Sequence, residues 1–193
     1  MAAEGWRNRG YLSHLNEAGA LQHIVFRLAD ALPPDRVGDP SWTSAKARLV
    51  AFDGLPDQGL GARHLSDPMI ADLVQHALLF FDGRRYHLQA WCVMPTHVHV
   101  LVLQEPGVAL GKVVHAWKSF TARQANVRLC RTGAFWAREY FDRAMRNERH
   151  AETAFNYIEA NPVKASLCAA PEDWPWSSAG CRKRFGETRA SGI

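Results

Sequence analysis

Two histidines, His97 and His99, stand in the middle of the apolar segment "CVMPTHVHVLV". In a β-strand, residues two apart point to the same face, so the two side chains are expected to be neighbours about 6–7 Å apart along the chain. Burying two imidazoles among valines and leucines costs free energy unless their ring nitrogens find partners. The pair is therefore either two satisfied structural histidines or two ligands of a divalent ion, for which neutral imidazole is a common donor.

Three hydrolase classes that use closely spaced histidines do not fit this pattern. A histidine-triad nucleotide hydrolase requires a third histidine where Leu101 stands. A two-histidine phosphoesterase requires two separated His-x-Ser/Thr pairs, and neither His97 nor His99 begins one. An amidohydrolase barrel is longer than this chain of 193 residues. Among catalytic interpretations, these exclusions leave an ion held by the histidines, with a nucleophile elsewhere.

A candidate for that nucleophile lies in the segment "NYIEANPVKASL". Tyr157 and Asn161 are four residues apart and share one face of the helix expected there. His150 precedes Tyr157 by seven residues on the same side and is a candidate base. The structural alternative is that Tyr157 packs with its hydroxyl at the surface and that Asn161 ends the helix, because Pro162 disfavours the helical conformation in the residue before it.

The elements that must position these residues form an α+β pattern. Strands are predicted by β-branched and aromatic residues at 21–29, 86–93 and 98–103. Helices are predicted at 41–52, 66–81, 110–129 and 147–161. Pro95 favours a hairpin between the second and third strands, and the segment 133–146 is expected to be partly extended. This order indicates an antiparallel sheet with helices packed against it.

Composition places the chain among globular proteins, with 47% hydrophobic residues and a net charge of +4. We expect one domain at residues 1–180 and a basic tail at 181–193. No apolar run approaches a membrane span, and the N-terminal segment lacks the apolar core of a signal peptide. The four cysteines are scattered without a CxxC pair, which favours free thiols and a cytoplasmic location. The positive charge is compatible with a polyanionic partner.

The chain resembles the single-tyrosine HUH transposases, in which U is any hydrophobic residue. The resemblance rests on two sequence blocks in order: "WCVMPTHVHVLV" and, about sixty residues later, "YIEANPVKASL". Within that group the chain is similar to the REP-associated tyrosine transposases. The segments "HIVFRLADALP", "AWKSFTA", "AFWAREYFDR" and "PEDWPWSSA" add to the resemblance, which covers roughly residues 10 to 180. Thr96 departs from the Asn or Asp that such proteins often carry before the first histidine.

The resemblance implies a ferredoxin-like α+β fold of the HUH endonuclease type and a nuclease and strand transferase for single-stranded DNA, often at hairpin-forming repeats. His97 and His99 match the metal-binding pair, Asn161 matches the position that can complete the site, and Tyr157 matches the nucleophile. The implied ion is Mg²⁺ or Mn²⁺, and the implied product is a 5′-phosphotyrosine with a free 3′-hydroxyl. Related transposases include dimers, so a monomer and a homodimer both remain open.

Basic and aromatic residues are candidates for contacting DNA. The possible phosphate contacts are Lys112, Lys118, Arg123, Arg128, Arg138, Arg143, Arg146 and Lys164. The possible base-stacking residues are Trp117, Phe135, Trp136 and Tyr140, with Trp117 also expected in the core. Two alternative functions remain: a catalytically inactive nucleic-acid-binding relative, and a metal-dependent phosphoesterase that forms no covalent intermediate.

Overall fold

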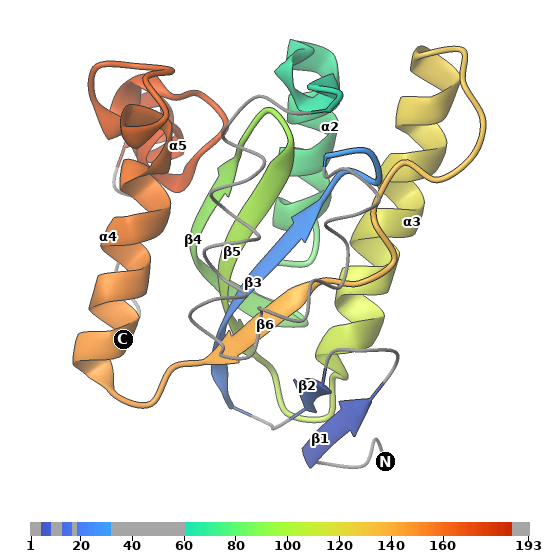
Figure 1. Cartoon of the computed structure of the whole chain (residues 1–193). Coiled ribbons are helices and arrows are strands. Elements are labelled where there is room, and N and C mark those ends of the chain that lie inside the picture. Colours follow the sequence, from blue (N-terminus) through green and yellow to red (C-terminus); the bar gives the residue numbers. More distant parts are fainter. Residues whose placement is uncertain (1–4, 9–12, 17–18, 32–60, 187–193) are drawn as a thin grey trace.

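The computed structural model describes residues 5–8, 13–16, 19–31 and 61–186. Its elements, drawn in Figure 1, are β1 (Gly5–Asn8), β2 (Ser13–Asn16), β3 (Leu21–Arg27), η2 (His64–Ser66), α2 (Pro68–Leu79), β4 (Tyr86–Val93), β5 (His97–Gln104), α3 (Leu110–Arg128), β6 (Phe141–Ala144), α4 (Glu148–Lys164), η3 (Pro171–Asp173) and α5 (Ser178–Phe185). The predicted helix at 41–52 lies outside the described residues.

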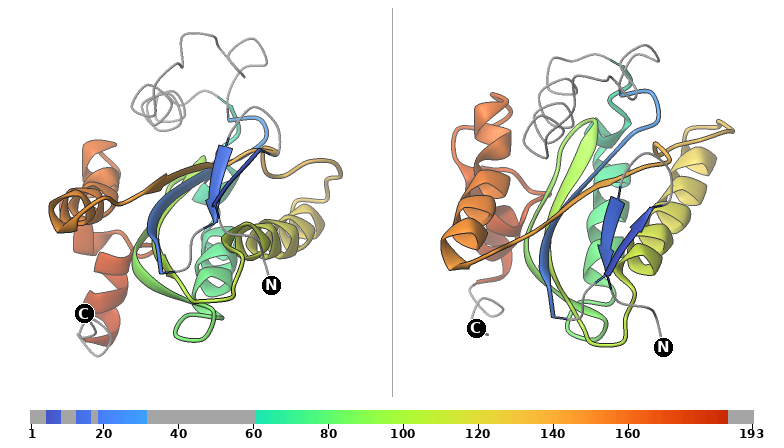
Figure 2. Two further views of the ribbon diagram at one scale, coloured as in Figure 1. Left: turned by 90° about the horizontal axis from the view of Figure 1, so that it is seen from below. Right: turned by 60° about the horizontal axis from the view of Figure 1, so that its bottom comes forward.

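The predicted antiparallel α+β fold is confirmed. Four strands pair in the order β4-β5-β3-β6, and every pairing in this sheet is antiparallel. Helices α2 and α3 cover one face of the sheet and α4 covers the other (Figure 2). Strand β5, which carries both histidines, lies between β4 and β3. A strand paired on both edges and covered on both faces is buried, which explains its nearly continuous apolar sequence.

Successive side chains of β5 point to opposite faces of the sheet and so enter two different hydrophobic cores. Val98, Val100 and Val102 join the larger core under α2 and α3. Leu101 joins a smaller core with Ala154 and Ile158 of α4 and residues of β4. His97 and His99 have the same parity as Leu101, so they face α4. The predicted hairpin is also confirmed, since the Met94 N–H donates to the His97 carbonyl at 2.8 Å across the turn that contains Pro95.

The aromatic residues before β6 belong to the core rather than to a nucleic-acid surface. Trp117, Phe135 and Trp136 are buried against the α2 and α3 side of the sheet. Trp136 Nε1 also donates to Thr121 Oγ1 at 2.9 Å. The prediction that Phe135 and Trp136 stack on bases is therefore wrong, because packing against the sheet removes their faces from solvent, whereas the expectation that Trp117 lies in the core is confirmed. Tyr140 alone of the four predicted rings remains half-buried.

Helix α4 extends beyond the predicted end at Asn161. It continues through Pro162 to Lys164, although Pro162 lacks the N–H that would bond one turn back. The loss of that one bond is tolerated because the next turn is still closed: the Ala165 N–H donates to the Asn161 carbonyl at 2.9 Å. Asn161 and Pro162 are buried, so packing holds them in place. Asn161 is therefore a helical residue facing the sheet and not a helix terminator.

The C-terminal part of the chain anchors α4. Glu159 of α4 accepts hydrogen bonds from Ser178 Oγ at 2.5 Å and Arg182 Nη2 at 2.6 Å, both in α5. The boundary predicted at residue 181 thus falls inside α5, and residues 187–193 of the predicted tail lie outside the described part. All four cysteines are free. No described helix is both long enough and apolar enough to cross a membrane.

Tyr86 gives a test of the core that is independent of function. Its buried hydroxyl donates to the Leu78 carbonyl at 2.6 Å and accepts from Trp117 Nε1 at 3.0 Å. Tyr86→Phe leaves both partners buried without this hydroxyl, so we expect the free energy of unfolding to fall by roughly 1–3 kcal/mol in urea titrations. A change within about 0.5 kcal/mol, as for an ordinary surface substitution, would contradict this role.

Candidate active site

The two histidines bring their ring nitrogens together beneath α4. Both side chains are fully buried, and His97 Nε2 lies 2.9 Å from His99 Nε2. Burial lowers the pKa of His97 well below its ordinary value and lowers that of His99 to about 3, with a smaller contribution from the Lys164 charge. Both rings are therefore neutral near pH 7, the state in which imidazole binds metal.

Neighbouring side chains fix the opposite ring nitrogens. Thr96 Oγ1 lies 2.9 Å from His97 Nδ1, and His23 Nε2 lies 3.1 Å from His99 Nδ1. A neutral ring carries one proton, and protons on both Nδ1 atoms satisfy these two contacts. The two Nε2 lone pairs then face each other at 2.9 Å, a repulsive arrangement that a shared cation relieves. Such partners on the outer nitrogen are typical of metal-binding histidines.

Asn161 supplies a third polar group at the same point. Its side-chain amide nitrogen lies 3.2 Å from His99 Nε2, and the residue is buried. The oxygen and nitrogen of a side-chain amide exchange places by rotation of the group. In the rotated state the amide oxygen faces His99 Nε2, which itself lies 2.9 Å from His97 Nε2. The three groups together then offer two nitrogens and one oxygen as ligands.

This donor set fits a small divalent cation. Ligands about 2.0–2.2 Å from an ion, at right angles to one another, are about 3 Å apart. The 2.9 Å and 3.2 Å separations match that spacing. Among the described residues no group of three His, Cys, Asp or Glu side chains forms a metal cluster. The set carries no negative charge, so it favours an ion shared with a phosphate over a permanently bound one.

Tyr157 lies beside this group on α4, one helical turn before Asn161. Its ring centroid is 6.0 Å from that of His99 and 6.4 Å from that of His23, both in edge-on arrangements. Lys164 Nζ lies 4.4 Å from the centre of the tyrosine ring. The structure therefore brings His97, His99, Tyr157 and Asn161 together, as the sequence predicted.

A family comparison agrees with this arrangement. The model of the family described as "Transposase IS200 like" matches residues 64–161, half of the chain, and the match includes both histidines, Tyr157 and Asn161. The chain belongs to the IS200-like transposase family.

Individual relatives of this chain are distant from it in sequence. A REP-associated tyrosine transposase of Escherichia coli is 24% identical over 107 residues, which cover 55% of this chain and 62% of the relative. A protein assigned to the same group in Haemophilus influenzae is 25% identical over 100 residues, which cover 46% of this chain and 56% of that protein. The matches thus span less than two thirds of these curated relatives.

The fold comparison covers more of the chain. A solved REP-associated tyrosine transposase bound to a REP hairpin has a TM-score of 0.58 and 17% sequence identity, and the match covers 97% of this chain and 90% of that one. At this identity the likeness establishes the shared fold. It agrees with the α+β architecture expected of an IS200-like transposase.

The hydrogen bonding of His150 argues against the role considered for it from the sequence, that of the base which accepts the proton of Tyr157. The Arg146 N–H donates to His150 Nδ1 at 3.3 Å, which leaves the ring proton on Nε2 when the imidazole is neutral. Burial, with the charges of Arg143 and Arg146, lowers the pKa of His150, so the neutral form dominates. In this tautomer the ring has no remaining lone pair with which to accept the proton of Tyr157.

His23 belongs to the candidate site, although the sequence alone did not predict it. It lies on β3, where its Cα partner on β5 is Leu101, so it shares the face of the two catalytic candidates. Burial first, and then the neighbouring His99, lowers its pKa well below the ordinary value. The sequence offered one sign of this role: a single histidine stands in the apolar segment "LQHIVFR", two residues before Val25 and therefore on the same face of the strand. Only the pairing of β3 with β5 shows that this ring supports His99.

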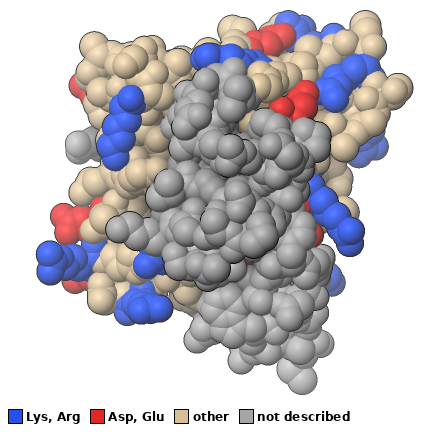
Figure 3. Space-filling model, viewed as in Figure 1, with Lys and Arg blue, Asp and Glu red and all other residues tan. Residues whose placement is uncertain are grey.

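The basic residues separate into different locations. Arg143 lies on β6 opposite His23, and Lys164 lies over Tyr157, so both belong to the histidine side. Lys118 and Arg138 line a hollow beside α3. Lys112, Arg123 and Arg146 are exposed, and Arg128 forms an ion pair with Asp67 at 2.8 Å. In the view of Figure 3, the visible lysines and arginines of the described residues lie at several separate places around the molecule.

Proposed function

We propose that this chain is a metal-dependent endonuclease and strand transferase for single-stranded DNA, acting at hairpin-forming repeats through a covalent 5′-phosphotyrosine at Tyr157. The observation that carries the proposal is the convergence of His97 Nε2, His99 Nε2 and the Asn161 amide beside Tyr157. The hairpin-bound relative of the same fold supports the choice of substrate.

His97, His99 and Asn161 would hold Mg²⁺ or Mn²⁺ jointly with the scissile phosphate. The bound ion would neutralise charge on that phosphate and stabilise the charge that develops during displacement. Thr96 and His23 keep the two imidazoles in the orientation that binding requires. Because the three ligands are neutral, DNA and ion are expected to bind cooperatively.

Tyr157 supplies the nucleophile. Its phenol oxygen attacks phosphorus, the bond from phosphorus to the 3′ oxygen breaks, the phenol proton is lost and the leaving oxygen gains a proton. A free phenol has a pKa of about 10 and is a weak nucleophile at neutral pH. The Lys164 ammonium, 4.4 Å from the ring centre, favours negative charge on the phenol. Attack by a 3′-hydroxyl on the phosphotyrosine reverses the step, so rejoining requires no ATP.

The form of the DNA provides the first test. With Mn²⁺, a labelled single-stranded or hairpin substrate should yield a denaturant-resistant, protease-sensitive adduct, and a blunt duplex of equal length should bind more weakly. The logarithm of the association constant should fall with the logarithm of salt concentration by about 0.7 per neutralised phosphate. Equal affinity for the duplex would count against the proposal. Binding without cleavage would favour the inactive relative, and cleavage without an adduct would favour the phosphoesterase.

A further inference from the structure

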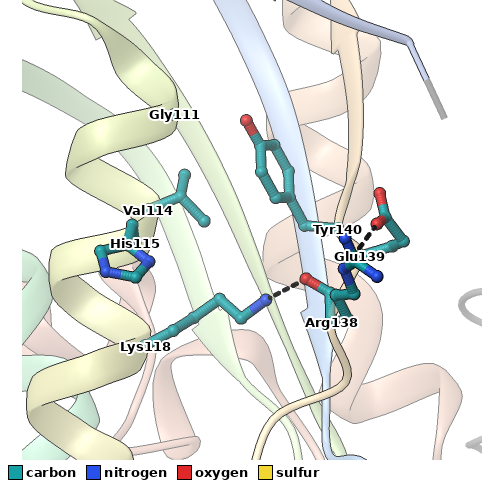
Figure 4. A pocket seen from close by; sticks show the side chains of 7 residues that line it. All are labelled: Gly111, Val114, His115, Lys118, Arg138, Glu139 and Tyr140. Atoms are coloured by element: carbon teal, nitrogen blue, oxygen red, sulfur yellow. Dashed lines mark hydrogen bonds and ion pairs between the residues drawn. The ribbon is translucent and has the colours of Figure 1, made fainter. Parts of the chain in front are cut away.

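A hollow of about 210 Å³ lies between α3 and the segment that leads into β6 (Figure 4). It opens on the α2 and α3 side of the sheet, because Tyr140, which lines it, packs against the core of that side. The histidines face the opposite side. Its lining residues are Gly111, Val114, His115, Lys118, Arg138, Glu139 and Tyr140.

Lys118 places a positive charge at the base of the hollow. Its ammonium crosses from α3 and donates to the carbonyls of Ala137 at 2.7 Å and Arg138 at 2.9 Å. Two of its three protons are thereby used. Burial lowers the pKa of Lys118 to about 8; the Glu139 charge acts in the opposite direction and the Arg27 charge lowers the pKa further. No carboxylate of the described residues lies within ion-pair distance of this ammonium, and the Glu139 carboxylate acts on it only from farther away.

Arg138 adds a second cation at the rim. Its side chain is 88% exposed, and its guanidinium lies 3.9 Å from the Glu139 carboxylate, which is beyond hydrogen-bonding distance. The planar guanidinium therefore keeps donors available for an oxyanion such as phosphate. Lys118 and Arg138 converge on the same hollow from two separate elements (Figure 4).

Tyr140 supplies an aromatic ring next to these charges. It is half-buried, and its ring stands between the segment before β6 and α3 (Figure 4). Rings of this kind bind nucleobases by stacking, with little dependence on base identity. A volume of about 210 Å³ is below the roughly 300–1,000 Å³ of sites for drug-sized ligands. The hollow therefore suits one part of a longer chain better than a complete cofactor.

We propose that this hollow binds one unpaired nucleotide of the DNA substrate, with its phosphate on Lys118 and Arg138 and its base against Tyr140. The inference rests on the proposed function, since it assumes a DNA substrate. Strand β6 is the edge of the sheet, and its Arg143 faces the histidine side while Tyr140 immediately before it faces the hollow. A single strand that passes over this edge contacts both sides.

Substitutions at the rim of the hollow distinguish a nucleotide-binding site from a nonspecific effect of positive charge on DNA affinity. The probe is a fluorescent single strand of mixed sequence, about 12 nucleotides long, and binding is measured by anisotropy in the Tyr157→Phe background so that no cleavage occurs. Arg138→Gln should weaken binding several-fold and reduce the salt slope by about 0.7, the effect of one phosphate. The matched control Arg123→Gln removes the same charge from an exposed position of α3 outside the hollow and should change the slope less.

The ring provides a second, uncharged test. Tyr140→Leu should weaken binding by about 5-fold or more through loss of stacking, while Tyr140→Phe keeps the ring and should bind as the parent does. Thermal unfolding confirms that each variant is folded. Equal affinities for Arg138→Gln and Arg123→Gln, or for Tyr140→Leu and Tyr140→Phe, would overturn the site. So would the same losses with a blunt duplex probe.

The two proposals fail in different ways. Failure of this site appears as unchanged affinity in the rim variants while the chain with Tyr157 intact still forms its adduct. Failure of the proposed function appears as absence of that adduct, whatever the affinities. A photoreactive 5-iodouracil in the single strand should crosslink to the peptide that contains Tyr140, and crosslinks confined to other peptides would also reject the site.

Discussion

Tyr157→Phe will fold, bind single-stranded hairpin DNA as the unsubstituted chain does, and form no covalent adduct. The substitution removes one oxygen and keeps the ring, so its edge-on contacts with His99 and His23 remain. A packing tyrosine that loses its hydroxyl costs about 1 kcal/mol of stability and little activity. A nucleophile that loses it leaves no covalent route. The measurement is a denaturing gel of labelled DNA incubated with protein and Mn²⁺.

The other three tyrosines are controls for this result. Tyr11→Phe, Tyr86→Phe and Tyr140→Phe should each retain adduct formation, although Tyr86→Phe should be less stable because its hydroxyl bridges Leu78 and Trp117. An adduct that persists in Tyr157→Phe and maps to another tyrosine would reject the residue but keep the class of enzyme. Cleavage without any adduct in the unsubstituted chain would reject the class.

Loss of either histidine ligand should abolish cleavage and leave most DNA binding intact. His97→Ala or His99→Ala removes one of the two nitrogens that lie 2.9 Å apart, so the proposed ion would lose a ligand directly. Replacing partners outside the ligand shell already costs metal sites about 10–100-fold, and loss of a ligand should exceed that. Calorimetric titration of Mn²⁺ with DNA present should show the weakened binding. Most of the DNA affinity should persist, because the proposed ion would share only the scissile phosphate and the other phosphates are expected to be bound elsewhere.

The matched control is His76→Ala. His76 is exposed on α2, on the other side of the sheet, and should be dispensable for cleavage and for Mn²⁺ binding. Because His97 and His99 are buried, each alanine variant needs a thermal unfolding curve, and His99→Gln offers a polar side chain that fills more of the space. If folded His97→Ala and His99→Ala cleave at the normal rate, the histidines are structural.

The local relationships within the site were predictable from the sequence. The period of a strand places His97 and His99 on one face, and the period of a helix places Tyr157 near Asn161. Strong apolar patterns and capping residues also predicted β3, α2, the β4–β5 hairpin and α3 to within a few residues. Each of these features depends on residues close together in the chain, where spacing determines geometry.

The errors arose where distant segments meet. Packing of α4 against the sheet carries the helix past Pro162, and packing against the sheet buries Phe135 and Trp136, which the sequence left available for DNA.

The sequence by itself determined which residues could do the chemistry: a same-face pair of histidines and a same-face tyrosine and asparagine. Only the tertiary structure decided that these pairs meet, that His23 supports His99 from β3, and that Lys118, Arg138 and Tyr140 line one hollow. The physical reason is that strand order and helix placement follow from burial of the whole core, a sum over many long-range contacts, whereas side-chain direction within one element follows from its backbone period.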